Sequence, residues 1–206
     1  MPTFQFYKNG SKIGQVVGAN KDALLKVIQQ YADAPSTLVQ AQPSPVPGFV
    51  DLTSLVHLKQ VDCLNLKSGS KASSLFTKDA GSIQSDVDEQ LVIVIPFSQA
   101  VKLHSVQFLS KDANACPKDV KTFINQASTP SFADLESSKE TEFLSVRPNE
   151  IMPLKFVRYQ SVHQLTLFII NNQQDLESTV MDQLIIYGAP VETTKMSDWN
   201  AGNDKH

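Results

Sequence analysis

Short apolar segments separated by turn residues recur from Phe49 to about Pro190, and they constrain the fold more than any other feature of the chain. The segments are rich in β-branched residues, as strands are. Strong helix signals are scarce, and residues 131–137, after Pro130, suffice for one or two turns. The pattern predicts a mainly β domain, a β-sandwich or jelly roll. The expected strands are residues 75–76, 91–97, 101–108, 120–124, 154–159, 165–170 and 184–187.

Two neighbouring segments predict more than strand. Residues 92–95 are apolar on both faces, as in a central strand whose outer side is covered. In residues 101–108 the apolar side chains change face between Leu103 and Val106. Such a change indicates a β-bulge, which re-aims the strand.

The first 31 residues predict a separate ββα unit. Residues 3–7 alternate as a strand, Asn9-Gly10 gives a hairpin signal, and residues 12–17 return as the second strand. Asn20 is a good N-cap for an amphipathic helix over residues 21–31. A unit this small is below the roughly 40 residues at which single domains fold without help, so it is expected to belong to something larger.

The chain is therefore divided into four parts. The ββα unit (1–31) is followed by a proline-rich linker (32–48), the β domain (49–190) and a polar tail (191–206). The 206 residues carry a net charge of -3, so they offer no basic field for a phosphate backbone, and nucleic acid is not an expected partner. No apolar run approaches the roughly 20 residues that span a bilayer.

Cysteine usage predicts a reduced, intracellular protein. The start of the chain lacks the charged and long apolar segments of a signal peptide. Cys63 and Cys116 are too far apart for a Cys-x-x-Cys motif and too few for a cysteine-based zinc site. Two reduced thiols are expected, Cys63 buried among apolar neighbours and Cys116 the more exposed in a polar loop.

No catalytic or metal-binding pattern stands out in the β domain. Its three histidines do not form the His-x-His cluster of a cupin metal site, so no metal and no cofactor are expected. The acidic run before the central strand is interpreted as a solvated turn or a backbone cap, with a Ca²⁺ loop or an acid/base pair as the weaker alternative. The histidines are His57, His104 and His163, and the acidic run consists of Asp86, Asp88 and Glu89.

The tail contains three candidate partner-binding residues. Met196 and Trp199 are apolar in a polar segment, and Trp199 is the one tryptophan of the chain. An aromatic anchor of this kind is typical of interface hot spots, and packing back onto the sandwich is the alternative. His206 brings an imidazole and a terminal carboxylate, two possible metal ligands, but an ordinary terminal residue is the favoured interpretation.

The ββα unit contains three characteristic motifs, Met1-Pro2-Thr3-Phe4, Phe6-Tyr7-Lys8-Asn9-Gly10 and Val16-Val17-Gly18-Ala19-Asn20. With these motifs, residues 1–20 resemble the second half of a thioredoxin domain. The resemblance implies that Pro2 matches the cis-proline that faces the redox disulfide in that family. The first half, with its Trp-Cys-x-x-Cys motif, is missing from the sequence. Without that pair of thiols the chain as given is expected not to be an enzyme, whereas its parent protein would be a disulfide oxidoreductase.

A second group of motifs extends through the β domain, and it includes Val61-Asp62-Cys63-Leu64-Asn65, Ser85-Asp86-Val87-Asp88-Glu89-Gln90-Leu91, Val120-Lys121-Thr122-Phe123-Ile124-Asn125, Pro153-Leu154-Lys155-Phe156-Val157 and Gly188-Ala189-Pro190-Val191. With these motifs, residues 49–198 resemble the PITH domain, the proteasome-interacting thioredoxin domain, which occurs in a family of thioredoxin-like proteins. The resemblance implies a jelly-roll β-sandwich that binds the proteasome regulatory particle, in the cytoplasm and nucleus. A jelly roll that binds a small ligand such as a carbohydrate is the alternative, although one Trp and four Tyr are few rings for stacking on sugars.

Overall fold

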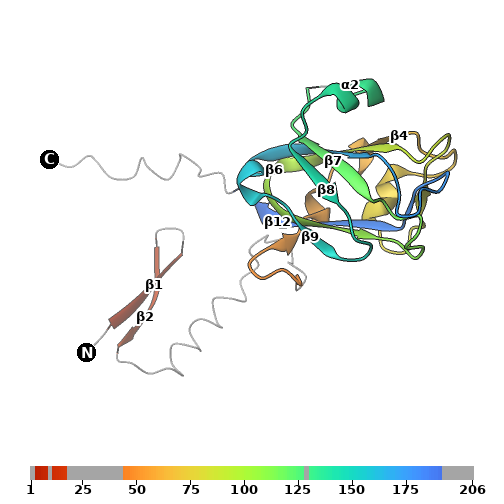
Figure 1. Ribbon diagram of the computed structural model, residues 1–206. Helices are drawn as coiled ribbons and strands as arrows, with labels where there is room; N and C mark the ends of the chain where they lie inside the picture. Colours follow the sequence, from red (N-terminus) through yellow and green to blue (C-terminus); the bar gives the residue numbers. More distant parts are fainter. Residues whose placement is uncertain (1–2, 9–10, 18–43, 128–129, 192–206) are drawn as a thin grey trace. The chain divides into compact units, whose positions relative to one another are not determined.

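A computed structural model describes residues 3–8, 11–17, 44–127 and 130–191 (Figure 1). The chain forms two units, residues 1–40 and 41–206, each described by itself. In the first unit β1 (Thr3–Lys8) and β2 (Ser11–Val17) form an antiparallel hairpin with a bulge between Phe6 and Tyr7. These strands agree with the expected ones, whereas Pro2 and the helix expected over residues 21–31 lie outside the described residues.

The second unit is a mainly antiparallel β-sandwich, as expected (Figure 1). Its main sheet curls on itself, with the strand order β3-β12-β6-β10-β7-β8 and with β4 and β9 also paired to β6. β5 and β11 form a small separate sheet. The strands are β3 (Val50–Asp51), β4 (Asp62–Leu64), β5 (Ile83–Gln84), β6 (Leu91–Leu109), β7 (Asp119–Ile124), β8 (Glu142–Ser145), β9 (Ile151–Pro153), β10 (Val162–Ile169), β11 (Val180–Met181) and β12 (Gln183–Pro190).

β6 organises the sandwich because its 19 residues belong to both parts of the curled sheet. Its first half pairs with β4 and β10, and its second half pairs with β9 and β12. Apolar side chains from both halves meet in the main core, among them Ile93, Leu103 and Phe108. The expected strands 91–97 and 101–108 are therefore one continuous strand.

A second, smaller core lies on the other face of the first half of β6. Val92 and Val94 point into it, while Ile93 and Ile95 point into the main core. The helix α2 (Phe132–Ser137) covers this face with Leu135. A capping box starts the helix, since the Ser131 hydroxyl accepts from the Asp134 N–H and the Asp134 carboxylate accepts from the Ser131 N–H. The covered central strand and the short helix are both confirmed.

The predicted bulge is also confirmed. Tyr187 of β12 pairs with Ser105 and Gly188 pairs with Leu103, so His104 is the extra residue on β6. Leu103, Ser105 and Val106 are buried, while His104 turns to the outer side. The bulge thus places a histidine at the surface where β6 passes from one part of the sheet to the other.

Two expected strands are wrong. Residues 75–76 lie in the 3₁₀ turn η3 (Ala72–Phe76), and residues 154–159, which follow β9, contain the 3₁₀ turn η4 (Phe156–Arg158). The remaining 3₁₀ turns are η1 (Thr53–Leu55) and η2 (Leu58–Gln60). Leu75, Phe76, Leu154 and Tyr159 are buried as expected, whereas Val157 is exposed. A short apolar run indicates burial of some of its residues without fixing the backbone conformation.

Candidate functional site

The burial of the two thiols is the reverse of the expectation. Cys116 has no exposed surface and packs in the main core, whereas Cys63 on β4 is half-buried. The segment around Cys116 is tied to the following loops, because the Cys116 carbonyl accepts from the Gln173 N–H at 3.0 Å and Ala115 accepts from Val180 at 2.8 Å. These tertiary contacts cover a loop whose polar sequence indicated exposure.

We expect neither thiol to react readily in the native protein. Burial, with a smaller contribution from Asp62, raises the pKa of Cys63 to about 12, and burial together with Asp182 raises the pKa of Cys116 to about 11. At pH 8 the thiolate population should fall at least ~100-fold below that of an unperturbed thiol. Iodoacetamide labelling followed by mass spectrometry measures this. A labelling rate of the native protein within tenfold of the rate for the protein unfolded in urea would contradict this prediction.

The histidines and the acidic run do not converge. His57 is exposed at the start of η2, His163 is exposed on β10, and His104 is half-buried at the bulge. Among the described residues no group of three His, Cys, Asp or Glu side chains could hold a metal ion. Asp88 caps its own turn, since its carboxylate accepts from Asn65 Nδ2 at 2.7 Å and from the Gln90 N–H at 3.1 Å. The backbone-cap interpretation is therefore confirmed for Asp88.

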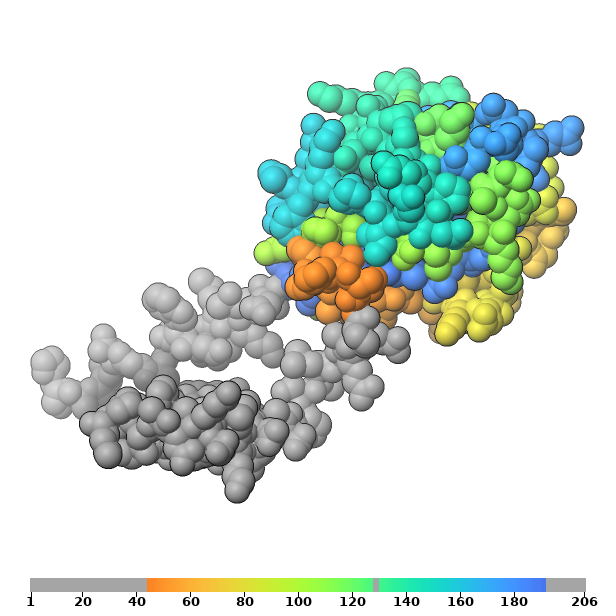
Figure 2. Space-filling view, turned by 60° about the horizontal axis from the view of Figure 1, so that its bottom comes forward, coloured from red at the N-terminus to blue at the C-terminus, as the bar shows by residue number. Residues whose placement is uncertain are grey.

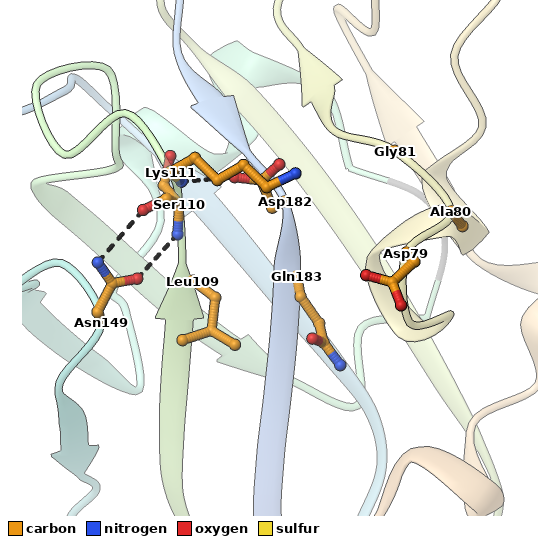
Figure 3. Close-up of a pocket in the computed structure, with 9 residues that line it drawn as sticks. All are labelled: Asp79, Ala80, Gly81, Leu109, Ser110, Lys111, Asn149, Asp182 and Gln183. Carbon is orange, nitrogen blue, oxygen red and sulfur yellow. Dashed lines mark hydrogen bonds between the residues drawn. The ribbon is translucent and has the colours of Figure 1, made fainter.

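A polar cavity of about 340 Å³ opens at one end of the sandwich (Figure 3). Asn149 braces one wall, with its side-chain amide bonded to both the N–H and the carbonyl of Ser110. Asp182 accepts from the Lys111 N–H at 2.6 Å. None of the residues that line the cavity is aromatic, so the cavity offers no ring on which a sugar could stack. The lining residues are Asp79, Ala80, Gly81, Leu109, Ser110, Lys111, Asn149, Asp182 and Gln183.

Three rings from distant parts of the sequence meet at the bulge, and we call Phe49, His104 and Phe156 the aromatic cluster. Phe49 stacks on His104 with ring centroids 4.1 Å apart, and it meets Phe156 edge-on at 5.5 Å. All three are partly exposed. Sequence reasoning did not select this cluster, although the change of face between Leu103 and Val106 was the signal that the strand re-aims a side chain there.

The candidate partner-binding residues Met196, Trp199 and His206 lie outside the described residues, as does Pro2. The structure therefore brings none of them to a site. In the part of the chain that is described, no helix has the length and apolarity needed to cross a bilayer.

Solved structures define the class of fold. The family 32 carbohydrate-binding module of Clostridium perfringens NanJ, in complex with galactose, matches with a TM-score of 0.51 and 9% identity over 68% of this chain and 98% of that chain. A SusE-like protein matches with a TM-score of 0.50 and 14% identity over 69% of this chain and 68% of that one. At these identities the likeness shows a shared β-sandwich and nothing of ligands.

Sequence comparison identifies the family. The PITH domain family model matches residues 42–204. Thioredoxin-like protein 1 of Schizosaccharomyces pombe is 36% identical over 203 residues, which cover 93% of this chain and 70% of that protein. PITH domain-containing protein CG6153 of Drosophila melanogaster is 30% identical over 131 residues, 59% of this chain and 61% of the relative. The chain belongs to the PITH domain family.

A shorter match concerns thioredoxin. Mouse thioredoxin is 59% identical over 32 residues, which cover 16% of this chain and 30% of that protein. The match agrees with the resemblance of the first residues to part of a thioredoxin domain. It covers less than a third of the mouse protein.

Proposed function

We propose that the β-sandwich is a docking module for the proteasome regulatory particle and that it brings a thioredoxin to that assembly. Membership of the PITH family is the observation that carries the proposal. The likeness to thioredoxin-like protein 1 over 93% of the chain supports the combination of a thioredoxin with this module. The docking would take place in the cytoplasm and nucleus.

The redox part of the proposal belongs to the parent protein. A disulfide reductase needs one thiolate that attacks and a second thiol that resolves the mixed disulfide. Cys63 and Cys116 lie in different environments of the sandwich, and burial raises the pKa of both. We therefore assign reductase chemistry to a Cys-x-x-Cys thioredoxin domain of the parent and binding to this chain.

The proposal predicts that the immobilised full chain retains purified 26S proteasomes. Native electrophoresis with a peptidase overlay quantifies the retained particles, and an unrelated β-sandwich of similar size is the control. Removing residues 191–206 is expected to weaken retention several-fold at an unchanged melting temperature, because the proposal places Met196, Trp199 and His206 at the contact.

Both measurements, with the full chain and with residues 191–206 removed, have an outcome that would contradict the proposal. Retention no greater than on the control sandwich would refute the docking function. Equal retention with and without residues 191–206 would show that the tail takes no part. A tail deletion that also lowers the melting temperature would place those residues in the fold.

Carbohydrate binding is the weaker candidate. The class of fold is shared with a galactose-binding module, but the polar cavity at the end of the sandwich has no aromatic lining residue. No observation on this chain favours a sugar over a protein partner.

A further inference from the structure

Two apolar side chains of η4, Phe156 and Val157, lie beside or within the aromatic cluster, and we call this pair the knob. Val157 in η4 has 87% of its surface exposed, and Phe156 next to it belongs to the cluster. The segment that carries Phe49 lies on the surface in Figure 2 (orange), against yellow-green and teal parts of the chain. Apolar side chains gathered at one exposed place indicate a contact surface more strongly than a single exposed residue does.

The knob is held in place by the fold. The Lys155 N–H donates to the Glu142 carboxylate at 2.9 Å, and the Tyr159 N–H closes η4 by donating to Phe156 at 3.1 Å. The Leu103 N–H then donates to the Tyr159 carbonyl at 3.0 Å, which joins the turn to β6. Because these bonds fix the turn, the exposure of Val157 is a property of the folded surface. A preorganised surface pays little ordering entropy on binding.

The surroundings of the knob are basic. Lys155 and Arg158 flank Val157 in the turn, and Lys102 shares the outer face of β6 with His104 by strand alternation. Arg158 donates to the Thr141 carbonyl, and the segments that carry Lys155 and Phe49 are joined to the carboxylate-bearing strands of Glu142 and Asp51. Glu142 is 7% exposed and lies 3.9 Å from the Lys155 ammonium, and Asp51 accepts from the N–H and hydroxyl of Thr53. The three cations outnumber these two carboxylates, so the named groups carry a net positive charge on a chain whose total is -3.

We propose that this surface docks an acidic protein segment through one apolar anchor. The anchor side chain packs on Phe156 and Val157, and flanking carboxylates of the partner pair with Lys102, Lys155 and Arg158. Charge complementarity of this kind steers association and fixes register. The net charge of -3 and the aliphatic side chain at the centre favour a peptide over a nucleic acid. As a description of the proteasomal contact, this inference rests on the proposed function.

The test uses the full chain labelled with ¹⁵N and a synthetic peptide of glutamates around one phenylalanine. We expect the amide resonances of Phe49, His104, Phe156 and Val157 to shift, with no such shifts for a peptide that carries lysines in place of the glutamates. Absence of shifts with the acidic peptide, or shifts centred elsewhere, would overturn the proposal. Tighter binding of poly(U) than of the acidic peptide would assign the surface to nucleic acid instead.

Matched variants identify the surface. V157D and V87D change equally exposed valines, at 87% and 86%, in different parts of the domain. V157D should weaken binding of the acidic peptide at least tenfold, while V87D should leave its affinity unchanged. The double variant K155E/R158E should also weaken binding of the acidic peptide at least tenfold. The double variant K71E/K78E makes the same charge change elsewhere and should not. Equal effects within either comparison would refute the surface.

Proteasome capture separates this inference from the proposed function. If the wild-type chain retains no proteasomes, the docking function fails and the peptide titration still decides the chemistry of the surface. If the wild-type chain and V157D retain proteasomes equally, the docking function stands and this surface is not its contact.

Discussion

Replacing Gly188 with alanine should lower the melting temperature of the sandwich by about 10 °C, or about 3 kcal/mol of unfolding free energy for a domain of this size. Gly188 lies on β12 opposite the bulge of β6. A Cβ there would lie 2.0 Å from the Lys102 carbonyl oxygen and 2.8 Å from Leu52 Cδ1. The oxygen belongs to the β6 backbone and Leu52 is fully buried, so the two strands would have to separate.

Gly81 provides the control for this substitution. It has a φ of +98° and no atom within 4 Å of an added Cβ, so G81A tests backbone strain without a clash. We expect it to cost about 1 kcal/mol. Thermal unfolding followed by circular dichroism compares the two. A G188A protein that melts within 2 °C of the wild type, on the order of 1 kcal/mol or less, would show that β12 can move away from the bulge.

Truncating Tyr159 to alanine should cost about 4 kcal/mol, whereas Y159F should cost about 1 kcal/mol. Tyr159 is among the largest fully buried side chains and packs in the main core. Its hydroxyl lies 2.6 Å from Thr122 Oγ1, and burial raises the pKa of the phenol. In Y159F the Thr122 hydroxyl keeps the Glu142 carbonyl as an acceptor at 3.1 Å, so little is left unsatisfied.

Urea unfolding of Y159A and Y159F separates the contribution of the ring to the free energy of unfolding from that of its hydroxyl. Y187F removes a comparable hydroxyl, which donates to Gln107 Oε1 at 3.1 Å, and Gln107 is partly exposed. Water can replace that bond, so we expect Y187F to cost less than Y159F. If Y159F were as unstable as Y159A, the hydrogen bond to Thr122 and not the packing of the ring would hold η4 to the core.

The strands of the sandwich could be predicted where burial and backbone conformation follow one pattern. Residues 120–124 and 165–169 lie in strands, and their side chains alternate between the two cores. β8 was missed because its polarity is inverted. Glu142 is buried at the Lys155 backbone, while Phe143 is 48% exposed. A sequence alone cannot indicate that a carboxylate points inward until the chain that satisfies it is known.

The aromatic cluster could be predicted only in part. The change of face at Leu103 indicated that β6 re-aims a side chain, and His104 is that side chain. Phe49 and Phe156 reach it from segments more than 50 residues away on either side, so no local spacing relates the three. The burial of Cys116 was missed for the same reason, because the segments that cover it are distant in sequence.

The continuity of β6 through both parts of the sheet couples local binding to global stability. One strand pairs with β4 and β10 at one end and with β9 and β12 at the other. Loss of β6 therefore removes pairing from both parts at once and disconnects them from each other, although β10 still pairs with β7 and β12 with β3. The domain therefore has no natural line along which it could unfold by halves, and it should open as one cooperative unit. A ligand held at the bulge would then raise the unfolding free energy of the entire sandwich by mass action, including strands that the ligand never touches.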